Sequence, residues 1–161
     1  MTSLTLGNRA ITFVSDGQEE TFIYEDAEAL VVALDGILGG APAVTEDPNG
    51  YEVTYFDWDG IRVLKPMGAG ATVSVSRASV GGVEIGTLEG VSVGTGRAAA
   101  EAAGAVDVGE GDDALGISIR EVPSAQSLTR PGAVGLDFVR LHLADAAVTQ
   151  LQAPAFDYGD L

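Results

Sequence analysis

Hydrophobic and polar residues alternate along the first part of the chain. Segments 11–14 and 21–24 each alternate with a period of two, and the polar segment 16–19, Asp-Gly-Gln-Glu, separates them. Alternation of this kind predicts strands with one buried face, and a short glycine-containing connection predicts a hairpin. We therefore expect an antiparallel hairpin in this region.

A helical spacing of apolar residues follows the predicted hairpin. The apolar residues recur at spacings of three, one, three and four: Ala27, Leu30, Val31, Leu34 and Leu38. This stripe predicts an amphipathic helix. Asp26 is a suitable N-cap, and Gly39-Gly40 is a suitable end.

Alternation then returns in a second predicted group of strands. Segments 51–58 and 61–65 are joined by the tight link Asp59-Gly60, and segment 72–77 would complete an antiparallel meander. The first half of the chain is thus predicted to be a helix followed by a meander.

The second half repeats this order of elements. The expected segments are strands at 83–85 and 90–93, a helix at 96–103 capped by Thr95, and strands at 115–122, 135–143 and 148–152. We predict an α+β fold of two tandem units, residues 1–80 and 81–161, each a short helix packed on an antiparallel β-meander. Units so small would gain stability by sharing a core or a continuous sheet.

The charge composition excludes nucleic acid as a partner. The 161 residues include 24 Asp and Glu against 8 Lys and Arg, which gives a net charge of −16. Such a surface repels phosphates, and the chain has no basic run that would overcome the repulsion. The chain contains no cysteine, which excludes disulfides, thiolate nucleophiles and Cys-ligated metals.

Membrane and targeting signals are weak. The longest apolar stretch, 29–34, is far shorter than the roughly 20 residues needed to span a bilayer, so we expect no transmembrane segment. The first five residues lack the basic and apolar regions of a secretory signal. We therefore expect either a cytoplasmic protein or the folded part of a longer one.

One segment resembles a known family. Gly90-Val91-Ser92-Val93-Gly94, followed by Thr95 and the alanine-rich segment 96–104, is similar to the Gly-apolar-x-apolar-Gly strand, cap and short helix of small bacterial envelope lipoproteins of the SmpA/OmlA type. The β-lactamase inhibitor proteins resemble two such units in tandem, with a concave sheet face that holds the target enzyme. The resemblance covers most of the second half, and the first half has Ile23-Tyr24-Glu25-Asp26 where the motif expects a glycine. It implies an extracytoplasmic, envelope-anchored and non-enzymatic protein.

Catalytic motifs are scarce. His142 is the only histidine, and the chain has no Gly-x-Ser-x-Gly elbow. Segment 94–99 fits a dinucleotide-binding fingerprint, but the predicted helix is too short for a crossover to a parallel strand. We expect neither an enzyme nor a cofactor, although a hydrolase that uses two of the many carboxylates remains an alternative.

The acidic loop 107–113 offers a second interpretation. Four carboxylates lie on a glycine-rich backbone: Asp107, Glu110, Asp112 and Asp113. Oxygen ligands of this type suit calcium, although the spacing is not that of an EF-hand. A calcium-binding or small-ligand-binding domain that uses this loop is the alternative function.

Alternation also places several aromatic and cationic residues on one predicted sheet face. If Tyr55, Ile61, Val63 and Ile117 point inward, the outward set is Phe56, Trp58, Arg62, Arg120, Arg140 and His142. Aromatic and arginine side chains are enriched at protein interfaces. The leading hypothesis is a non-catalytic binding or structural module that recognises a protein or an envelope component through this face. In the alternative interpretation the arginines pair across strands with Glu52 and Glu121, and a register error of one residue would exchange the two faces.

Overall fold

A computed structural model describes residues 2–159. These residues form twelve strands and two helices. The first sheet contains β1 (Ser3–Leu6), β2 (Ala10–Ser15), β3 (Gln18–Ile23), β8 (Ser79–Val80) and β9 (Val83–Thr87). The second contains β4 (Ala43–Glu46), β5 (Val53–Asp57), β6 (Ile61–Pro66), β7 (Thr72–Val75), β10 (Ala114–Gln126), β11 (Val134–Ala144) and β12 (Ala147–Phe156). The helices are α1 (Ala27–Leu38) and α2 (Arg97–Ala102).

The predicted α+β class is wrong, because the protein is mostly β. Strands account for 49% of the structure and helices for 11%. The six residues of α2 form fewer than two helical turns and bury only Ala100, so this helix cannot cover a sheet. Neither helix of the described residues is long and apolar enough to cross a membrane.

The arrangement of two helix-on-meander units is also wrong. The five-stranded sheet has the order β3-β2-β1-β9-β8, and the seven-stranded sheet has the order β10-β11-β12-β7-β6-β5-β4. Strand β1 pairs in parallel with β9, and β7 pairs with β12, so each sheet joins segment 1–80 to segment 81–161. Apart from the β1–β9 pair, all neighbouring strands are antiparallel.

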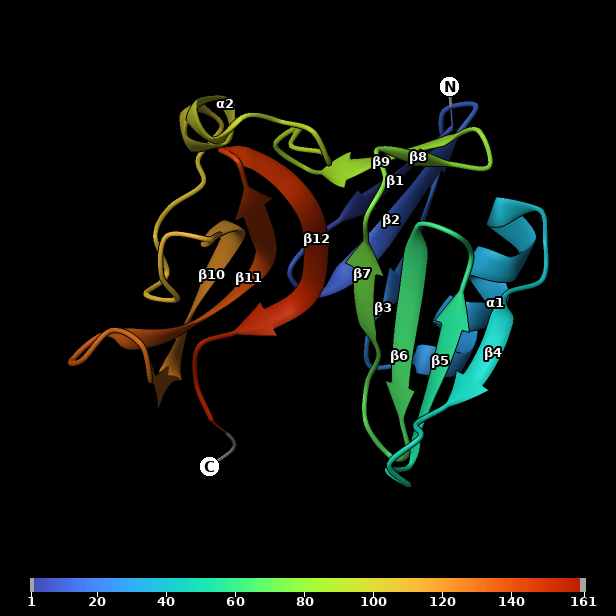
Figure 1. Ribbon diagram of the computed structural model, residues 1–161, viewed down its shortest axis with the longest axis horizontal. Helices are drawn as coiled ribbons and strands as arrows, with labels where there is room; N and C mark the ends of the chain where they lie inside the picture. Colours follow the sequence, from blue (N-terminus) through green and yellow to red (C-terminus); the bar gives the residue numbers. More distant parts are fainter. Residues whose placement is uncertain (1, 160–161) are drawn as a thin grey trace.

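The seven-stranded sheet changes direction at β12. Only three residue pairs connect β12 to β7, from Leu151↔Val75 to Ala153↔Val73. Figure 1 shows β12 as a strongly curved strand, with β10 and β11 on one side and β4 to β7 on the other. Strands β1 to β3 lie behind this junction, so parts of both sheets meet close to it (Figure 1).

One large core joins the two sheets and α1. Its fully buried side chains include Leu4, Ile11, Leu30, Leu34, Val63, Val73, Leu141 and Leu151. A smaller cluster lies on the opposite face of β11 and β12 and comprises Val108, Leu136, Phe138 and Ala155. Val108 belongs to the acidic loop, which therefore covers this part of the sheet.

Most predicted segments exist as secondary structure. The first hairpin turns at Asp16 and Gly17, whose positive φ values of 51° and 77° suit a two-residue connection. The Asp26 side chain accepts a hydrogen bond from the Ala29 amide at 3.1 Å, and Gly39 ends α1 in the left-handed region at a φ of 72°. The sequence pattern did not predict the short strands β1, β4 and β8.

Two predictions around α2 are wrong. Residues 90–93 do not form a strand. The Thr95 hydroxyl accepts a hydrogen bond from the Ser92 amide at 3.1 Å, so Thr95 stabilises the preceding turn, and Gly96 occupies the N-cap position without a side-chain hydrogen bond. The strand and cap of the lipoprotein-like motif are therefore not formed, although a short helix and Gly104 follow.

Candidate functional site

The structure places Phe56 and Trp58 against the core rather than on an open face. Trp58 is 7% exposed, and its Nε1 donates a hydrogen bond to the Gly40 carbonyl at 3.1 Å. Phe56 packs against the same core, with its ring centroid 6.4 Å from that of Trp58. The face of β5 that points to the core is thus the opposite of the predicted one, an exchange equivalent to a shift of one residue along the strand.

Arg62 does lie on the outer face of the sheet, but it is engaged locally. Its Nε lies 3.0 Å from Oδ1 of Asp57, and its guanidinium lies 4.8 Å from the centroid of the Tyr55 ring. This cross-strand pair matches the alternative interpretation of the arginines, although the partner differs from the predicted one.

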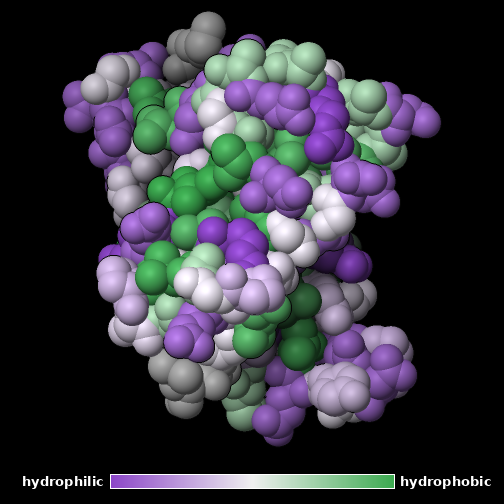
Figure 2. Space-filling model, turned by 90° about the vertical axis from the view of Figure 1, so that its left-hand side faces the viewer, coloured by the Kyte–Doolittle hydropathy of each residue, from purple (hydrophilic) through white to green (hydrophobic). Residues whose placement is uncertain are grey.

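Arg140 contacts the acidic loop, and His142 shares a hydrogen-bonding partner with Arg140. The Arg140 Nε and Nη2 atoms are each 2.6 Å from an oxygen of Glu110, and both side chains are 19% exposed. His142 Nε2 lies 3.0 Å from Oε1 of Gln152, which also accepts a hydrogen bond from Arg140 at 3.3 Å. Figure 2 shows the left-hand side of the molecule in Figure 1, where hydrophobic side chains gather near the middle and hydrophilic ones surround and divide them. Arg62, Arg140 and His142 share the outer face of the seven-stranded sheet, whereas Phe56 and Trp58 point to the core, so the six predicted face residues do not form one surface.

The acidic loop does not bring its four carboxylates together. Asp107 Oδ1 accepts a hydrogen bond from the Gly109 amide at 2.7 Å, and Glu110 is occupied by Arg140. Asp112 and Asp113 contribute main-chain carbonyls, which accept hydrogen bonds from other parts of the chain. Residues 2–159 contain no group of three or more side chains that could hold a metal ion. The geometry therefore gives the calcium interpretation no support.

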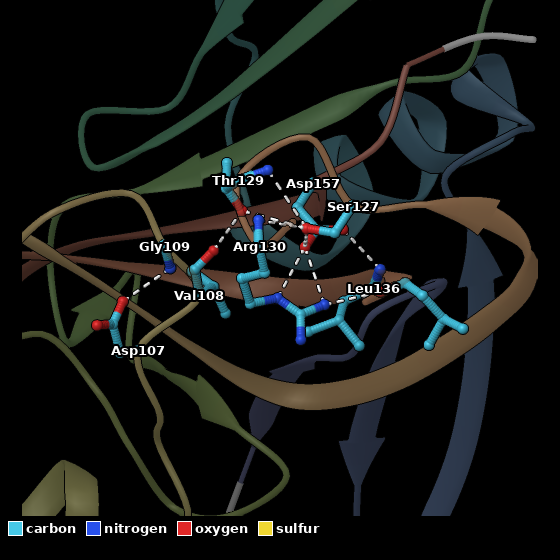
Figure 3. Close-up of polar contacts among 9 residues, drawn as sticks. Asp107, Val108, Gly109, Ser127, Thr129, Arg130, Leu136 and Asp157 are labelled. Carbon is cyan, nitrogen blue, oxygen red and sulfur yellow. Dashed lines mark hydrogen bonds and ion pairs between the residues drawn. The ribbon is translucent and has the colours of Figure 1, made fainter. Parts of the chain in front are cut away.

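A buried polar cluster surrounds the Asp157 carboxylate, directly after β12 (Figure 3). Ser127 Oγ donates a hydrogen bond to it at 2.6 Å, the Leu136 amide donates one at 2.7 Å, and Arg130 donates from Nε at 3.2 Å and from Nη2 at 3.1 Å. Desolvation alone would raise the pKa of Asp157, but these hydrogen bonds outweigh it and hold the pKa below its ordinary value. We call this group the Asp157 cluster.

The Ser127 hydroxyl in this cluster has no unused hydrogen-bond donor or acceptor position. It donates to Asp157, and it accepts hydrogen bonds from the amides of Arg130 at 2.9 Å and Thr129 at 3.3 Å. A hydroxyl group has one proton to donate and two lone pairs to accept with, so all three are used. The Thr129 hydroxyl in turn donates to the Val108 carbonyl at 2.6 Å (Figure 3), which fastens the acidic loop to the β10–β11 connection.

The structure reveals a different candidate site, a cleft of about 510 Å³ where the first sheet faces the end of the second. One wall comes from the β1–β2 turn, the end of β3 and the β6–β7 connection, and the other comes from β10, β11 and the C-terminal end of β12. The cleft is lined by Asn8, Arg9, Ile23, Tyr24, Glu25 and Gly70 on the first side, and by Arg120, Asp137, Pro154, Phe156 and Tyr158 on the second. We call it the inter-sheet cleft.

The polar part of the inter-sheet cleft is a fixed network around Asp137. Arg120 pairs with Oδ2 of this carboxylate, and the Tyr158 hydroxyl donates a hydrogen bond to Oδ1 at 2.5 Å. Desolvation, together with the hydrogen bond to Asp137, raises the pKa of Tyr158 to about 12. Tyr158 is therefore a neutral hydrogen-bond donor at neutral pH, and both oxygens of Asp137 have partners.

The rim that carries Arg9 is held from two directions. The Asn8 side chain donates a hydrogen bond to the Ser118 carbonyl of β10 at 2.7 Å, and the buried Tyr24 hydroxyl donates one to the Gly7 carbonyl at 2.8 Å. The first bond crosses between the two sheets. The turn is thus positioned in advance, and ordering it on ligand binding would cost little.

The remaining walls are apolar and open to solvent. Ile23 is 50% exposed and Phe156 is 51% exposed, and both line the inter-sheet cleft together with Pro154. The Phe156 and Tyr158 ring centroids are 5.4 Å apart. Large half-exposed apolar side chains beside placed polar groups are typical of small-ligand sites.

Of the predicted site residues, only Arg120 lines this cleft. The other residues that line the inter-sheet cleft come from distant parts of the sequence, and no regular spacing connects them. The one available signal was the pair of apolar residues at strand ends, Ile23 and Phe156, and many strand ends carry such residues. No known family model, curated protein or solved structure matches the chain.

Proposed function

We propose that this protein is a non-catalytic binding module that holds a small ligand in the inter-sheet cleft. The observation that carries the proposal is the combination of half-exposed Ile23 and Phe156 with a rim fixed by hydrogen bonds. A volume of about 510 Å³ lies within the range of small-ligand pockets. Burial of these two side chains by a ligand would supply the main favourable free energy of binding.

A non-catalytic role is supported by the state of the nucleophiles and bases. All hydrogen-bonding groups of the Ser127 hydroxyl are used, and the His142 ring contacts the Gln152 side chain. Neither residue lines the inter-sheet cleft. Within the cleft, Tyr158 has a raised pKa and Asp137 is fully partnered, so neither suits a general base at neutral pH.

Recognition through an open sheet face is not proposed in its original form, because the two aromatic residues predicted for that face, Phe56 and Trp58, point to the core. The relation to envelope lipoproteins and the extracytoplasmic location that it implies remain predictions, independent of the cleft.

The test uses a neutral aromatic probe, 2-naphthylacetamide, titrated into ¹⁵N-labelled protein. We expect amide shifts to concentrate in segments 22–25 and 154–158, which line the inter-sheet cleft. Replacing Phe156 by alanine should weaken binding at least fivefold, because roughly 1–2 kcal/mol of apolar contact is lost. The matched control is Met67→Ala, which removes a side chain that is 73% exposed and lies outside the cleft. Shifts scattered over the surface, or equal loss in both variants, would contradict the proposal.

A further inference from the structure

The ion pairs of the described residues leave one cation without a carboxylate partner. The pairs are Arg62–Asp57, Lys65–Glu28, Arg77–Asp59, Arg97–Glu101, Arg120–Asp137, Arg130–Asp157 and Arg140–Glu110. The chain has eight lysines and arginines, and Arg9 is the one that remains unpaired within residues 2–159. Arg9 is one of the residues that line the inter-sheet cleft.

This unpaired cation is notable in a protein of net charge −16. Most of such a surface repels an approaching anion, whereas a guanidinium without an internal partner offers a fork of N–H donors that fits a carboxylate. Arg9 is exposed and therefore free to reorient toward a ligand, while its backbone is held by the turn described above.

The other charges of the inter-sheet cleft limit the ligand to one negative charge. Asp137 is neutralised by Arg120 and by the Tyr158 hydroxyl, so it contributes little repulsion. Glu25 also lines the cleft and is exposed, and it opposes a second negative charge. A monocarboxylate fits this balance better than a dicarboxylate or a phosphate dianion.

We propose that the inter-sheet cleft selects small monocarboxylic acids with an apolar body, and that Arg9 binds the carboxylate. Ile23 and Phe156 contact the apolar body, and the rest of the polar network fixes the far wall. This inference rests on the proposed function, since it names the ligand class of the same cleft.

The experiment compares two probes of nearly equal shape, 2-naphthylacetate and 2-naphthylacetamide, by NMR titration at neutral pH. For the wild-type protein we expect the acid to bind about tenfold more tightly than the amide, because a charge-assisted hydrogen bond contributes roughly 1.5 kcal/mol.

Variants of Arg9 then assign the preference. Arg9→Ala should reduce the acid-to-amide ratio to about one while keeping the affinity for the amide, and Arg9→Lys should retain part of the ratio because the charge remains without the planar fork. The control Arg77→Ala removes another exposed arginine, outside the inter-sheet cleft, and should leave the ratio unchanged.

The outcomes separate this inference from the function beneath it. If acid and amide bind the wild-type protein equally well, or if the preference for the acid survives Arg9→Ala, the assignment of the ligand class is wrong. The proposed function, binding of a small ligand in the inter-sheet cleft, is not contradicted by either result. If neither probe binds, both the inference and the proposed function fail.

Discussion

Replacing Asp157 by asparagine should destabilise the whole protein. The Asp157 side chain is completely buried, and its carboxylate accepts hydrogen bonds from Ser127, the Leu136 amide and two nitrogens of Arg130. The asparagine side chain keeps the shape of the aspartate but carries no charge, and its NH₂ group would face the hydrogen-bond donors that now surround the carboxylate. Removing one member of a buried pair costs about 3–5 kcal/mol. Because the Arg130 side chain is 31% exposed and can be rehydrated, we expect a loss of about 3 kcal/mol.

The assay is guanidinium denaturation followed by the fluorescence of Trp58, the only tryptophan and a buried one. This probe lies in the β4–β7 part of the sheet, so it reports global unfolding rather than a local opening near Asp157. The expected loss corresponds to a decrease in Tm of roughly 6–12 °C for a chain of this size. The control is Asp59→Asn, whose side chain is 86% exposed and paired with Arg77, and which should change stability by less than about 0.5 kcal/mol. Equal effects of the two substitutions would refute the reasoning.

The same variant should also change the acid stability of the protein. The native pKa of Asp157 lies below its ordinary value of 3.8, so the folded state binds this proton less tightly than the unfolded state. Its contribution to stability is therefore present above pH 3.8 and is lost as the pH falls through the native pKa. The difference in unfolding free energy between wild type and Asp157→Asn should be constant near neutrality and shrink below about pH 4. A difference that grows in acid would contradict this sign.

Three further predictions concern packing and ionisation. Arg140→Ala should cost about 1–3 kcal/mol by thermal denaturation, and the additional change Glu110→Ala should recover part of that loss, whereas strictly additive losses would mean that the two side chains do not interact. Gly116→Ala should lower the unfolding free energy by about 1–3 kcal/mol, because a Cβ there would lie 2.5 Å from a methyl group of Val108 in the acidic loop. In the control Gly36→Ala on α1, the new Cβ has nothing within 4 Å, so the unfolding free energy should stay the same or rise. In a spectroscopic pH titration, Tyr158 should ionise near pH 12, and its stabilising contribution should be lost as the pH rises from 10 toward 12; ionisation at pH 10 would contradict the raised pKa.

Local segments were predictable because their signals are local. The spacing of Leu30 and Leu34, the Asp26 cap and Gly39 together define α1 to within a residue, and Asp16-Gly17 defines the first turn. These features depend on neighbours in the sequence, whose distances are fixed by the covalent chain. The strand boundaries of β5 were also close to correct.

The predicted local hairpins formed, but the predictions that depended on which face of β5 is buried, or on pairing between distant segments, were wrong. The inward position of Phe56 and Trp58 follows from the contact of Trp58 with Gly40 and from the core, and alternation alone gives the two faces equal weight. The pairing of β1 with β9, between segments 3–6 and 83–87, has no local sequence signal either. That pairing and the β7–β12 contact replaced two separate units by two shared sheets.

The amino-acid sequence by itself determined α1 and most of the longer strands, the strong negative charge and the absence of cysteine chemistry. Only the tertiary structure decided which strands are neighbours, which face of β5 is buried, and that Arg9, Ile23, Arg120 and Phe156 line one cleft. The reason is physical: secondary structure is encoded by interactions over a few residues, whereas sheet order and clefts arise from burying apolar surface between segments far apart in the chain. Many pairings satisfy the same local pattern, and the shared core selects one of them.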